Sequence, residues 1–415
     1  MKKILSITSL LCLLAQVSWA DSTEENINKF NPVHTALYSQ TVAADARSAG
    51  MGEVGAATDP DVASQFWNPA KYPFCISKAG VQLSYTPWLR QLVSDMNIAH
   101  LTGYYRIGDY SAVSASLKYF ALGSIYEEAD ESGNYNESTV QRPYEMSFDV
   151  GYSLMLSEKF SLGTAVRLLV SDMSYTQKDE KKTASAFAAD IAGYYQNYVN
   201  IGERECQLGL GFNISNIGSK ITFGGSNRSE FIPTNMRLGA SLMIPINEYN
   251  RFAISADANK LLVPTYPTKD QYKDYCKTEL GKSDSDFNTS GEIPDYPYQT
   301  YLDDKYFNIG SIEGIFKSFS DAPGGLKEEL QEIQWSVGAE YTYNDRFSIR
   351  AGYHDEAENK GNRKYFTVGA GFRLSAFTLD AAYCIATSNS NPLDKTLRFS
   401  LNFDLDGLQE LFGKR

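Results

Sequence analysis

The feature of this sequence that most constrains its fold is a long series of segments in which apolar and polar residues alternate one by one. In the clearest segment, Tyr144, Met146, Phe148, Val150, Tyr152, Leu154 and Leu156 alternate with Glu145, Ser147, Asp149, Gly151 and Ser153. Successive side chains of a β-strand point to opposite faces, so this spacing predicts a strand with one apolar and one polar face. Residues 113–121 and 397–403 show the same alternation.

Similar runs recur along the chain from about residue 79. They begin near Val81, Ile98, Phe160, Ala184, Leu208, Met236, Phe252, Ile333, Phe347, Phe366 and Phe377. Together with the three clearest segments they predict about fourteen strands, each long enough for a tilted membrane crossing of about 9–11 residues.

The predicted connections alternate between short and long. Short ones lie at residues 108–110, 157–159, 247–250, 344–346 and 375–376, and longer ones near 128–142, 177–183, 218–232, 263–331, 357–363 and 389–395. Short periplasmic turns that alternate with long external loops are typical of outer-membrane β-barrels. Residues 198–205 are a modest exception, because this predicted connection is longer than the other connections on the periplasmic side.

The polar faces of the predicted strands carry charges of both signs. These are Glu145, Asp149, Arg167, Asp257, Glu340, Arg350, Arg373, Asp380 and Arg398. A charge that faces lipid costs about 2–4 kcal/mol at the membrane midplane, so we expect these side chains to point into a lumen. A closed barrel also leaves no unpaired strand edge in the membrane. The sequence therefore predicts an all-β fold, an antiparallel transmembrane barrel of about fourteen strands over residues 79–405, rather than a soluble β-sandwich or adhesin repeat.

Composition excludes three other classes of protein. The 28 Tyr and 22 Phe residues would bury a sizeable core, which argues against a disordered chain. The net charge of −12 opposes binding to nucleic acid, whose phosphates attract basic proteins. No apolar run of about 18 residues or more is present, which argues against a helical membrane protein.

Residues 1–20 are predicted to be a signal peptide. Lys2 and Lys3 precede an apolar stretch over 4–17, and Ser18-Trp19-Ala20 places small residues where cleavage is expected. The apolar stretch is too short to favour the alternative of an uncleaved anchor. The mature chain is thus expected to be exported from a bacterial cytoplasm. Its cysteines match no zinc-binding pattern, and an even number in an exported chain permits disulfides without identifying a pair; they are Cys75, Cys206, Cys276 and Cys384.

Residues 21–78 precede the first predicted strand. The stretch 46–61 is rich in Gly and Ala, which allow close backbone packing, and Asn68-Pro69 favours a turn. We expect this segment to be a plug or hatch inside the lumen. A periplasmic cap over the barrel base is the alternative, and neither arrangement makes these residues catalytic.

Residues 263–331 form the one long insertion, which the alternation of connections places outside the cell. Its first part is rich in tyrosine: Tyr266, Tyr272, Tyr275, Tyr296, Tyr298, Tyr301 and Tyr306. Tyrosine is common among the residues that anchor protein interfaces, so the insertion suits protein recognition. The alternative is a loop that folds over the mouth of its own barrel, with the Ile/Phe face of residues 312–319 packed on the barrel. The two arrangements are compatible with each other.

The second part of the insertion predicts a short helix near residues 311–320. Its apolar residues fall on one face, at positions 312, 315, 316 and 319. Ser311 is the expected cap at its start, and the stretch 321–325 (Asp-Ala-Pro-Gly-Gly) is expected to end it. Residues 406–415 are expected to form a C-terminal tail.

Several of these stretches resemble a known superfamily. The segment with Arg47, Gly50-Met51-Gly52, Asp59 and Asn68-Pro69-Ala70 resembles the FadL-like superfamily of fourteen-stranded outer-membrane barrels. The amphipathic strands and the stretch 312–329, with its helix and its Asp-Ala-Pro-Gly-Gly end, more closely resemble the PorV (LptO) family of the type IX secretion system. The resemblance covers essentially the whole mature chain, and the stretch 312–329 is its more discriminating part.

The resemblance implies a non-enzymatic protein of the outer membrane of a Gram-negative bacterium, without cofactor or metal. It implies that the protein receives cargo through a C-terminal signal domain from a translocon barrel and delivers it to a sortase-like attachment complex. Partners would then be these proteins and outer-membrane lipid. The candidate cargo contacts, chosen by their chemistry alone, are Tyr296, Tyr298, Tyr301, Ile315, Phe316 and Phe319. The residues of the plug motif are Arg47, Gly50, Gly52, Asp59, Asn68 and Pro69.

Two other functions remain as alternatives. A FadL-type transporter of hydrophobic small molecules would share the fold and the plug, but it would need an apolar pocket in the barrel. An outer-membrane lipase or lipid A deacylase would need an oriented Ser–His pair. Only three histidines are available, His34, His100 and His354, and we interpret His354 as a solvated surface residue near the outer end of a strand. Finally, deletion of about residues 266–306 is expected to spare barrel folding and abolish cargo capture.

Overall fold

The computed structural model describes residues 30–90, 93, 95–125, 140–173, 183–223, 228–387, 393–411 and 413. The predicted signal peptide lies outside the described residues, and so do most of the predicted external loops near 128–142, 177–183 and 389–395. Among the described residues, no helix is both long enough and apolar enough to span a membrane.

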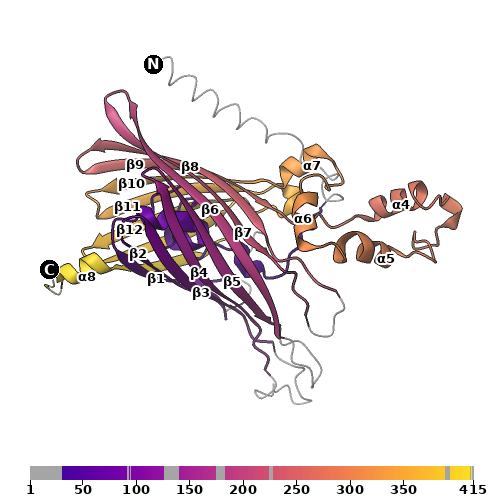
Figure 1. The fold of residues 1–415 in the computed structure, drawn as a ribbon. Helices are drawn as coiled ribbons and strands as arrows, with labels where there is room; N and C mark the ends of the chain where they lie inside the picture. The colour runs from indigo at the N-terminus through magenta and orange to yellow at the C-terminus, as the bar shows by residue number, and fades with distance from the viewer. Residues whose placement is uncertain are drawn as a thin grey trace.

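Fourteen antiparallel strands form a closed barrel in which each strand pairs with its sequence neighbours and β1 pairs with β14 (Figure 1). The strands are β1 (Ala79–Pro87), β2 (Met96–Ile107), β3 (Ser111–Leu122), β4 (Tyr144–Ser157), β5 (Phe160–Asp172), β6 (Thr183–Ile201), β7 (Arg204–Gly218), β8 (Asn235–Asn247), β9 (Asn250–Leu261), β10 (Gln334–Tyr343), β11 (Phe347–Asp355), β12 (Tyr365–Leu374), β13 (Phe377–Ala386) and β14 (Leu397–Asp404). The predicted all-β fold and its strand number are confirmed.

The apolar faces of the strands point outward and the polar faces point inward. In β4, Phe148 and Tyr152 are 47% and 46% exposed, whereas Ser147 and Asp149 are almost fully buried. Eight of the nine charged residues expected in the lumen are buried, and the exception is Arg373. Arg373 lies at the end of β12, where it is exposed and approaches Asp404 at 3.7 Å. A strand end lies outside the apolar part of the membrane, so a charge there needs no lumenal partner.

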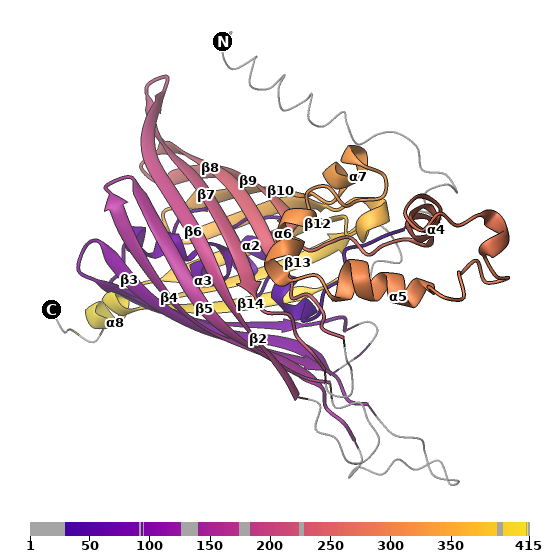
Figure 2. The same ribbon diagram turned by 45° about the vertical axis from the view of Figure 1, so that its right-hand side comes forward.

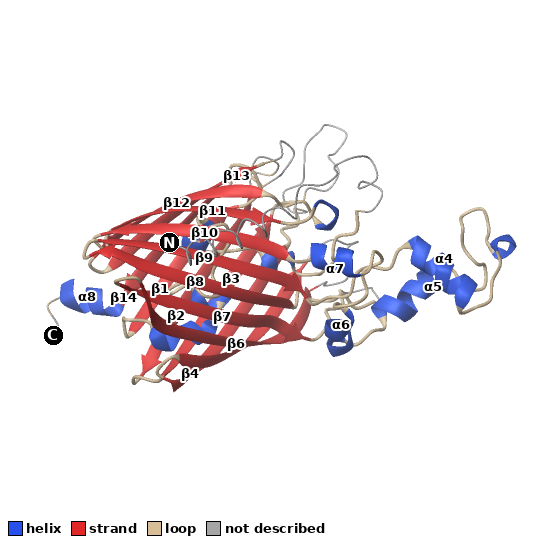
Figure 3. Cartoon of the chain, turned by 90° about the horizontal axis from the view of Figure 1, so that it is seen from above, coloured by secondary structure: helices blue, strands red, loops and turns tan. Residues whose placement is uncertain are grey.

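The two ends of the barrel differ (Figures 1 and 3). One end carries the short turns together with the C-terminal helix α8 (Leu405–Leu411), and the other carries the remaining helices that lie outside the wall. The end with the short turns is the periplasmic one. The prediction of a longer connection over 198–205 is wrong, because β6 and β7 continue through these residues and leave only Gly202 and Glu203 in the turn.

Among the described residues before β1, η3 (Tyr38–Thr41) lies at the outer mouth. Three further short helices lie inside the barrel (Figure 2): α2 (Ala46–Ala49), α3 (Ser64–Trp67) and η4 (Pro69–Phe74). Helix η4 packs on the inner faces of β2 to β6, and α2 packs on β12 to β14. We refer to residues 42–75 as the plug. The stretch before it, residues 30–41, runs along the outer mouth of the barrel, where Asn31 donates a backbone hydrogen bond to Asn359.

The long insertion between β9 and β10 contains several short helices at the outer end of the barrel. These are α4 (Lys269–Thr278), η6 (Asp284–Asp286), α5 (Tyr298–Leu302), η7 (Asp303–Phe307), α6 (Ser311–Lys317) and α7 (Leu326–Gln331). The predicted helix near 311–320 corresponds to α6, but Gly310 rather than Ser311 is its N-cap. The stretch 312–329 is not one helix, because residues 318–325 separate α6 from α7 and Gly325 has a positive φ of 64°.

Candidate functional site

Arg47 connects the plug to the barrel wall. Its guanidinium forms ion pairs with Glu340 of β10 at 3.0 Å and with Asp61 of the plug at 2.8 Å. Glu340 also accepts from Arg350 of β11 at 2.6 Å, and Arg350 in turn pairs with Asp380 of β13 at 2.7 Å. A continuous network of buried and half-buried charges therefore holds the plug against the strands.

Two glycines allow the plug backbone to touch the wall. Gly52 has a φ of +72°, and a Cβ at this position would lie 2.7 Å from the backbone nitrogen and oxygen of Tyr353. A Cβ on Gly50 would lie 3.0 Å from the Cα of Gly369. Glycine is required at position 52 both by its conformation and by this contact.

The remaining residues of the plug motif stabilise the plug, mainly through hydrogen bonds within it and to the wall. The Asn68 side chain donates to the carbonyl oxygens of Ala56 at 2.8 Å and Gly193 at 3.0 Å, and its Oδ1 accepts from the amide of Ala70. Pro69 is the first residue of η4, a position where its missing N–H does no harm. The Asp59 carboxylate accepts from Gln207 of β7 at 2.7 Å.

Charged side chains fill much of the remaining interior. Arg167 of β5 pairs with Asp149 at 2.7 Å and with Asp190 at 2.9 Å, and all three side chains are buried. Lys118 of β3 donates to the carbonyl oxygen of Val42 at 2.8 Å. A cavity beneath the mouth has a volume of only about 30 Å³ and is lined largely by polar and charged residues. This cavity therefore offers hydrophobic molecules little space.

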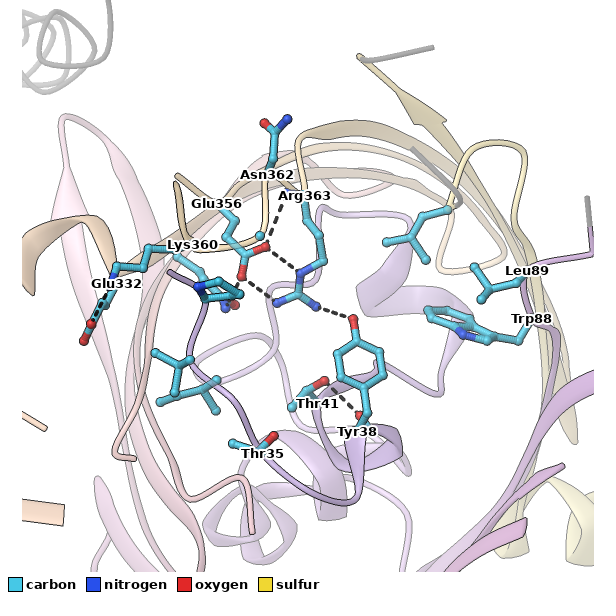
Figure 4. A pocket seen from close by; sticks show the side chains of 16 residues that line it. Thr35, Tyr38, Thr41, Trp88, Leu89, Glu332, Glu356, Lys360, Asn362 and Arg363 are labelled. Carbon is cyan, nitrogen blue, oxygen red and sulfur yellow. Dashed lines mark hydrogen bonds and ion pairs between the residues drawn. The ribbon is translucent and has the colours of Figure 1, made fainter. Parts of the chain in front are cut away.

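A larger pocket opens at the outer mouth, with a volume of about 470 Å³ (Figure 4). Arg363 forms a two-pronged ion pair with Glu356 at 2.8 and 3.0 Å and donates to the hydroxyl of Tyr38 at 3.1 Å. Lys360 pairs with Glu332 at 3.0 Å. Apolar side chains line other parts of the pocket: Pro32, Val33, Trp88, Leu89, Leu261 and Leu393. The pocket thus combines apolar surface with charges that are already paired.

Residues 268–302 form an arm that projects from the outer mouth (Figures 2 and 3). Its centre is Tyr272, which is fully buried and donates to the carbonyl of Tyr296 at 2.7 Å, while its hydroxyl accepts from the amide of Ile293 at 2.8 Å. Tyr298 and Tyr301 each lie 5.5 Å from the Tyr272 ring, between ring centroids. The three candidate tyrosines at 296, 298 and 301 are therefore brought together as the small core of the arm.

A second aromatic cluster holds the base of the arm. Tyr306 packs edge-on against Phe231 at 5.4 Å and against Tyr266 at 5.0 Å, and Arg228 pairs with Asp303 at 2.6 Å. Sequence alone did not single out Phe231, because a lone aromatic residue in a loop gives no periodic signal.

Helix α6 lies outside the arm and presents its apolar face to solvent. Phe316 is 73% and Phe319 48% exposed, and Ile315 is half-buried. The opposite side of the helix packs at Gly314, where a Cβ would lie 2.7 Å from the Phe231 ring. The alternative in which the Ile/Phe face packs on the barrel is therefore wrong, because glycine allows the other side to make the closer contact.

Of the three histidines considered for catalysis, His100 and His354 are buried and His34 is exposed. His354, which we interpreted as a solvated surface residue, is only 3% exposed: it stacks on Tyr365 at 4.9 Å, and its Nδ1 lies 2.9 Å from the Ser336 hydroxyl. Ser336 is 1% exposed in the barrel wall, where a lipid substrate would not reach it. Within the described ranges, no group of three or more metal-ligating side chains is found. The cysteines at 75, 206, 276 and 384 are buried free thiols.

Comparison with known proteins identifies the family. A family model described as "Type IX secretion system protein PorV" matches residues 24–268, more than half of the chain. No curated protein matches the sequence.

Several solved structures are similar to this chain at low identity. The Ralstonia pickettii toluene transporter TbuX is 12% identical with a TM-score of 0.42, over 86% of this chain and 96% of TbuX. A Pseudomonas aeruginosa FadL homologue is 11% identical with a TM-score of 0.41, over 88% and 99%. The Pseudomonas putida toluene transporter TodX is 11% identical with a TM-score of 0.42, over 87% and 96%. On the family match, this chain, a fourteen-stranded β-barrel, belongs to the PorV family and is an outer-membrane protein of the type IX secretion system.

Proposed function

We propose that this protein is a non-enzymatic receptor at the cell surface. It takes cargo by its C-terminal signal domain as the cargo leaves the translocon barrel and passes it to a sortase-like attachment complex. Membership in the PorV family supports the link to type IX secretion. The observation that carries the proposal is the contrast between a lumen filled by the plug and an outer mouth that presents a pocket, an arm and an apolar helix face.

The plugged lumen argues against passage of protein through this barrel. Opening the lumen would separate Arg47 from Glu340 and break the link between the plug and the charge network of the wall. Asn68 and Asp59 would lose their hydrogen bonds to the wall in the same movement. Cargo is therefore held outside the barrel, not within it.

The outer mouth has the features of a protein-binding surface. A stable interface buries roughly 800 Å² on each partner, which a pocket alone does not supply but which the pocket, the arm and α6 together can. The proposed apolar anchors are Ile315 and the exposed Phe316 on α6, together with the exposed Phe319 just after its end. Tyr296, Tyr298 and Tyr301 give the arm its shape, so their contribution to binding is to hold its surface in place.

A deletion of residues 268–302, bridged by a short Gly-Ser linker, tests this proposal. The deletion is shorter than 266–306 because Tyr266, Asp303 and Tyr306 hold the base through Phe231 and Arg228. The variant is expected to keep the heat-modifiable electrophoretic mobility of a folded barrel and to lose binding of a purified cargo signal domain. Normal binding by the folded variant would contradict a role for the arm.

A transporter of hydrophobic small molecules is the second candidate, favoured by the apolar part of the mouth pocket. The small polar cavity below that pocket and the charged interior weigh against it. Lipid extraction of the purified protein distinguishes the two, because a transporter would retain a hydrophobic ligand in stoichiometric amount.

A further inference from the structure

The hairpin of β6 and β7 extends farther into the periplasm than its neighbours (Figures 1 and 2). β5 pairs with β6 only as far as Phe160 opposite Tyr195, and one further hydrogen bond of 2.8 Å runs from the Gln196 amide to the Lys159 carbonyl. β6 then continues to Ile201, supported only by β7. At about 3.3 Å per residue, the five residues 197–201 project roughly 17 Å.

One edge of this projection has unpaired backbone groups. In an antiparallel ladder, the N–H and C=O groups of alternate residues point to alternate sides. Because the Gln196 amide points to β5, the groups of Tyr198 and Asn200 point to the same side, beyond the end of β5. Among the described residues, no strand pairs with this edge, so two consecutive outward-pointing residues each present an open donor and an open acceptor.

The edge lacks the features that usually prevent strands from pairing. Natural sheet edges are protected by charged side chains or proline, whereas residues 197–201 read Asn-Tyr-Val-Asn-Ile. Tyr, Val and Ile also favour extended structure. The charges of the hairpin lie on the other strand and in the turn, at Arg204, Glu205 and Glu203. Tyr198 is 55% and Ile201 45% exposed, so each face of the projection offers apolar surface.

We propose that the edge Asn197–Ile201 of β6 is a periplasmic docking site at which an extended segment of another protein adds as a strand. The backbone itself defines the occupant. The open N–H and C=O groups recur every second residue, and an extended polypeptide chain has backbone groups at the same spacing, whereas a compact ligand does not. The exposed Tyr198 and Ile201 side chains select apolar residues in that segment. This site lies at the end of the barrel opposite the proposed cargo-binding mouth, so it does not depend on that function.

Hydrogen–deuterium exchange of the tagged wild-type protein tests the proposal. The amides of Tyr198 and Asn200 are expected to exchange at least about tenfold more slowly in the complex gently extracted from its own membrane than in the protein purified alone. Equal rates in the two samples would overturn the proposal. Protection in the purified protein that disappears on dilution would also overturn it, because the edge would then pair with a second copy of this chain.

A matched pair of variants separates backbone pairing from side-chain contact. Asn200→Pro removes an N–H that has no partner within the described protein, and Asn200→Ala keeps it. In the extracted complex, Asn200→Pro is expected to abolish the protection of the Tyr198 amide, while Asn200→Ala retains it. Loss of protection in both variants, or in neither, would contradict strand addition.

Discussion

Arg47 in the plug and Glu340 in β10 lie 293 positions apart in the sequence and form two parallel hydrogen bonds, of 3.0 and 3.2 Å. Hydrogen bonds between ionised groups are roughly twice as strong as neutral ones, and the paired geometry fixes their direction. Glu340 also binds Arg350, so the plug joins a charge network within the wall. The side chains that attach the plug to the wall therefore also connect neighbouring strands of the wall.

Arg47→Ala is predicted to loosen the plug. The loss of one partner of this buried pair is expected to destabilise the plugged state by about 3–5 kcal/mol, although Arg350 still compensates part of the Glu340 charge. Conductance of the purified protein in planar bilayers would then show frequent openings. Arg251→Ala is the control, since its exposed pair with Asp345 in the periplasmic turns contributes only about 0–1 kcal/mol. Equal conductance of both variants would contradict the role of Arg47.

Gly52→Ala is predicted to displace the plug from β11. A methyl group would meet the Tyr353 backbone at 2.7 Å, which adds an overpacking cost of about 1–3 kcal/mol to the strain of a positive φ. Gly108→Ala is the matched control: its φ is also positive, at 65°, but nothing lies within 4 Å of the added Cβ. Thermal unfolding in detergent should show a clearly lower midpoint for Gly52→Ala than for Gly108→Ala, and similar midpoints would refute the proposed contact.

Tyr272→Phe is predicted to loosen the arm without removing it. The buried Ile293 amide and Tyr296 carbonyl would lose their partner, at a cost of about 1–3 kcal/mol. This corresponds to a roughly 5- to 150-fold faster exchange of the Ile293 amide. Tyr275→Phe, whose hydroxyl has no hydrogen-bond partner in the described part of the arm, should leave the rate unchanged. An unchanged Ile293 rate in Tyr272→Phe would show that this hydroxyl does not organise the arm.

The stretch between α6 and α7 is predicted to become less stable as the pH rises. Burial, together with the nearby carboxylates of Glu329 and Glu332, raises the pKa of Asp321 from 3.8 to about 7, against the opposing effects of Lys260 and of the Thr265 amide. The folded state therefore binds this proton more tightly than the unfolded state does. The resulting stabilisation is complete below pH about 4 and is lost as the pH rises through about 7.

Amide exchange in α7, corrected for the intrinsic pH dependence, measures this effect between pH 5 and 8. Protection should fall across this range in the wild-type protein and stay nearly constant in Asp321→Asn. The same slope in both proteins would assign the effect to another group.

The double variant Phe316→Ser/Phe319→Ser is predicted to weaken cargo binding. Truncation of one anchor residue of an interface costs about 2 kcal/mol or more, which is about 30-fold in affinity, and such costs are not additive. The double variant should therefore bind a purified signal domain at least about 30-fold more weakly. Folding should be unaffected, because both side chains are largely exposed. Ile76→Ser, at a 96% exposed position before β1, is the control. Unchanged affinity of the double variant would exclude α6 as an anchor.

The barrel could be predicted from sequence because its signal is local and repeated. In β4, every second residue from Tyr144 to Leu156 is apolar, and a lipid-facing wall requires this order. The exceptions lie at strand ends, such as Arg373 and the residues around 198–205, where the membrane no longer imposes the alternation.

The contacts of the mouth could not be predicted in the same way, because they join distant residues. The packing of Gly314 on Phe231, which leaves Phe316 exposed, depends on two loops that no periodic pattern connects. The burial of His354 beside Ser336 likewise follows from the pairing of β10 with β11 rather than from any local motif.

We propose above that this barrel is a plugged receptor for exported cargo. Mass spectrometry of the tagged protein, gently extracted with detergent from its native membrane and analysed for both proteins and lipids, tests it most directly. Co-purification of a very large translocon barrel, or of several unrelated proteins that share one type of C-terminal domain, is the expected result. Recovery of the barrel alone, with a stoichiometric fatty acid or hydrocarbon, would contradict it and indicate a transporter.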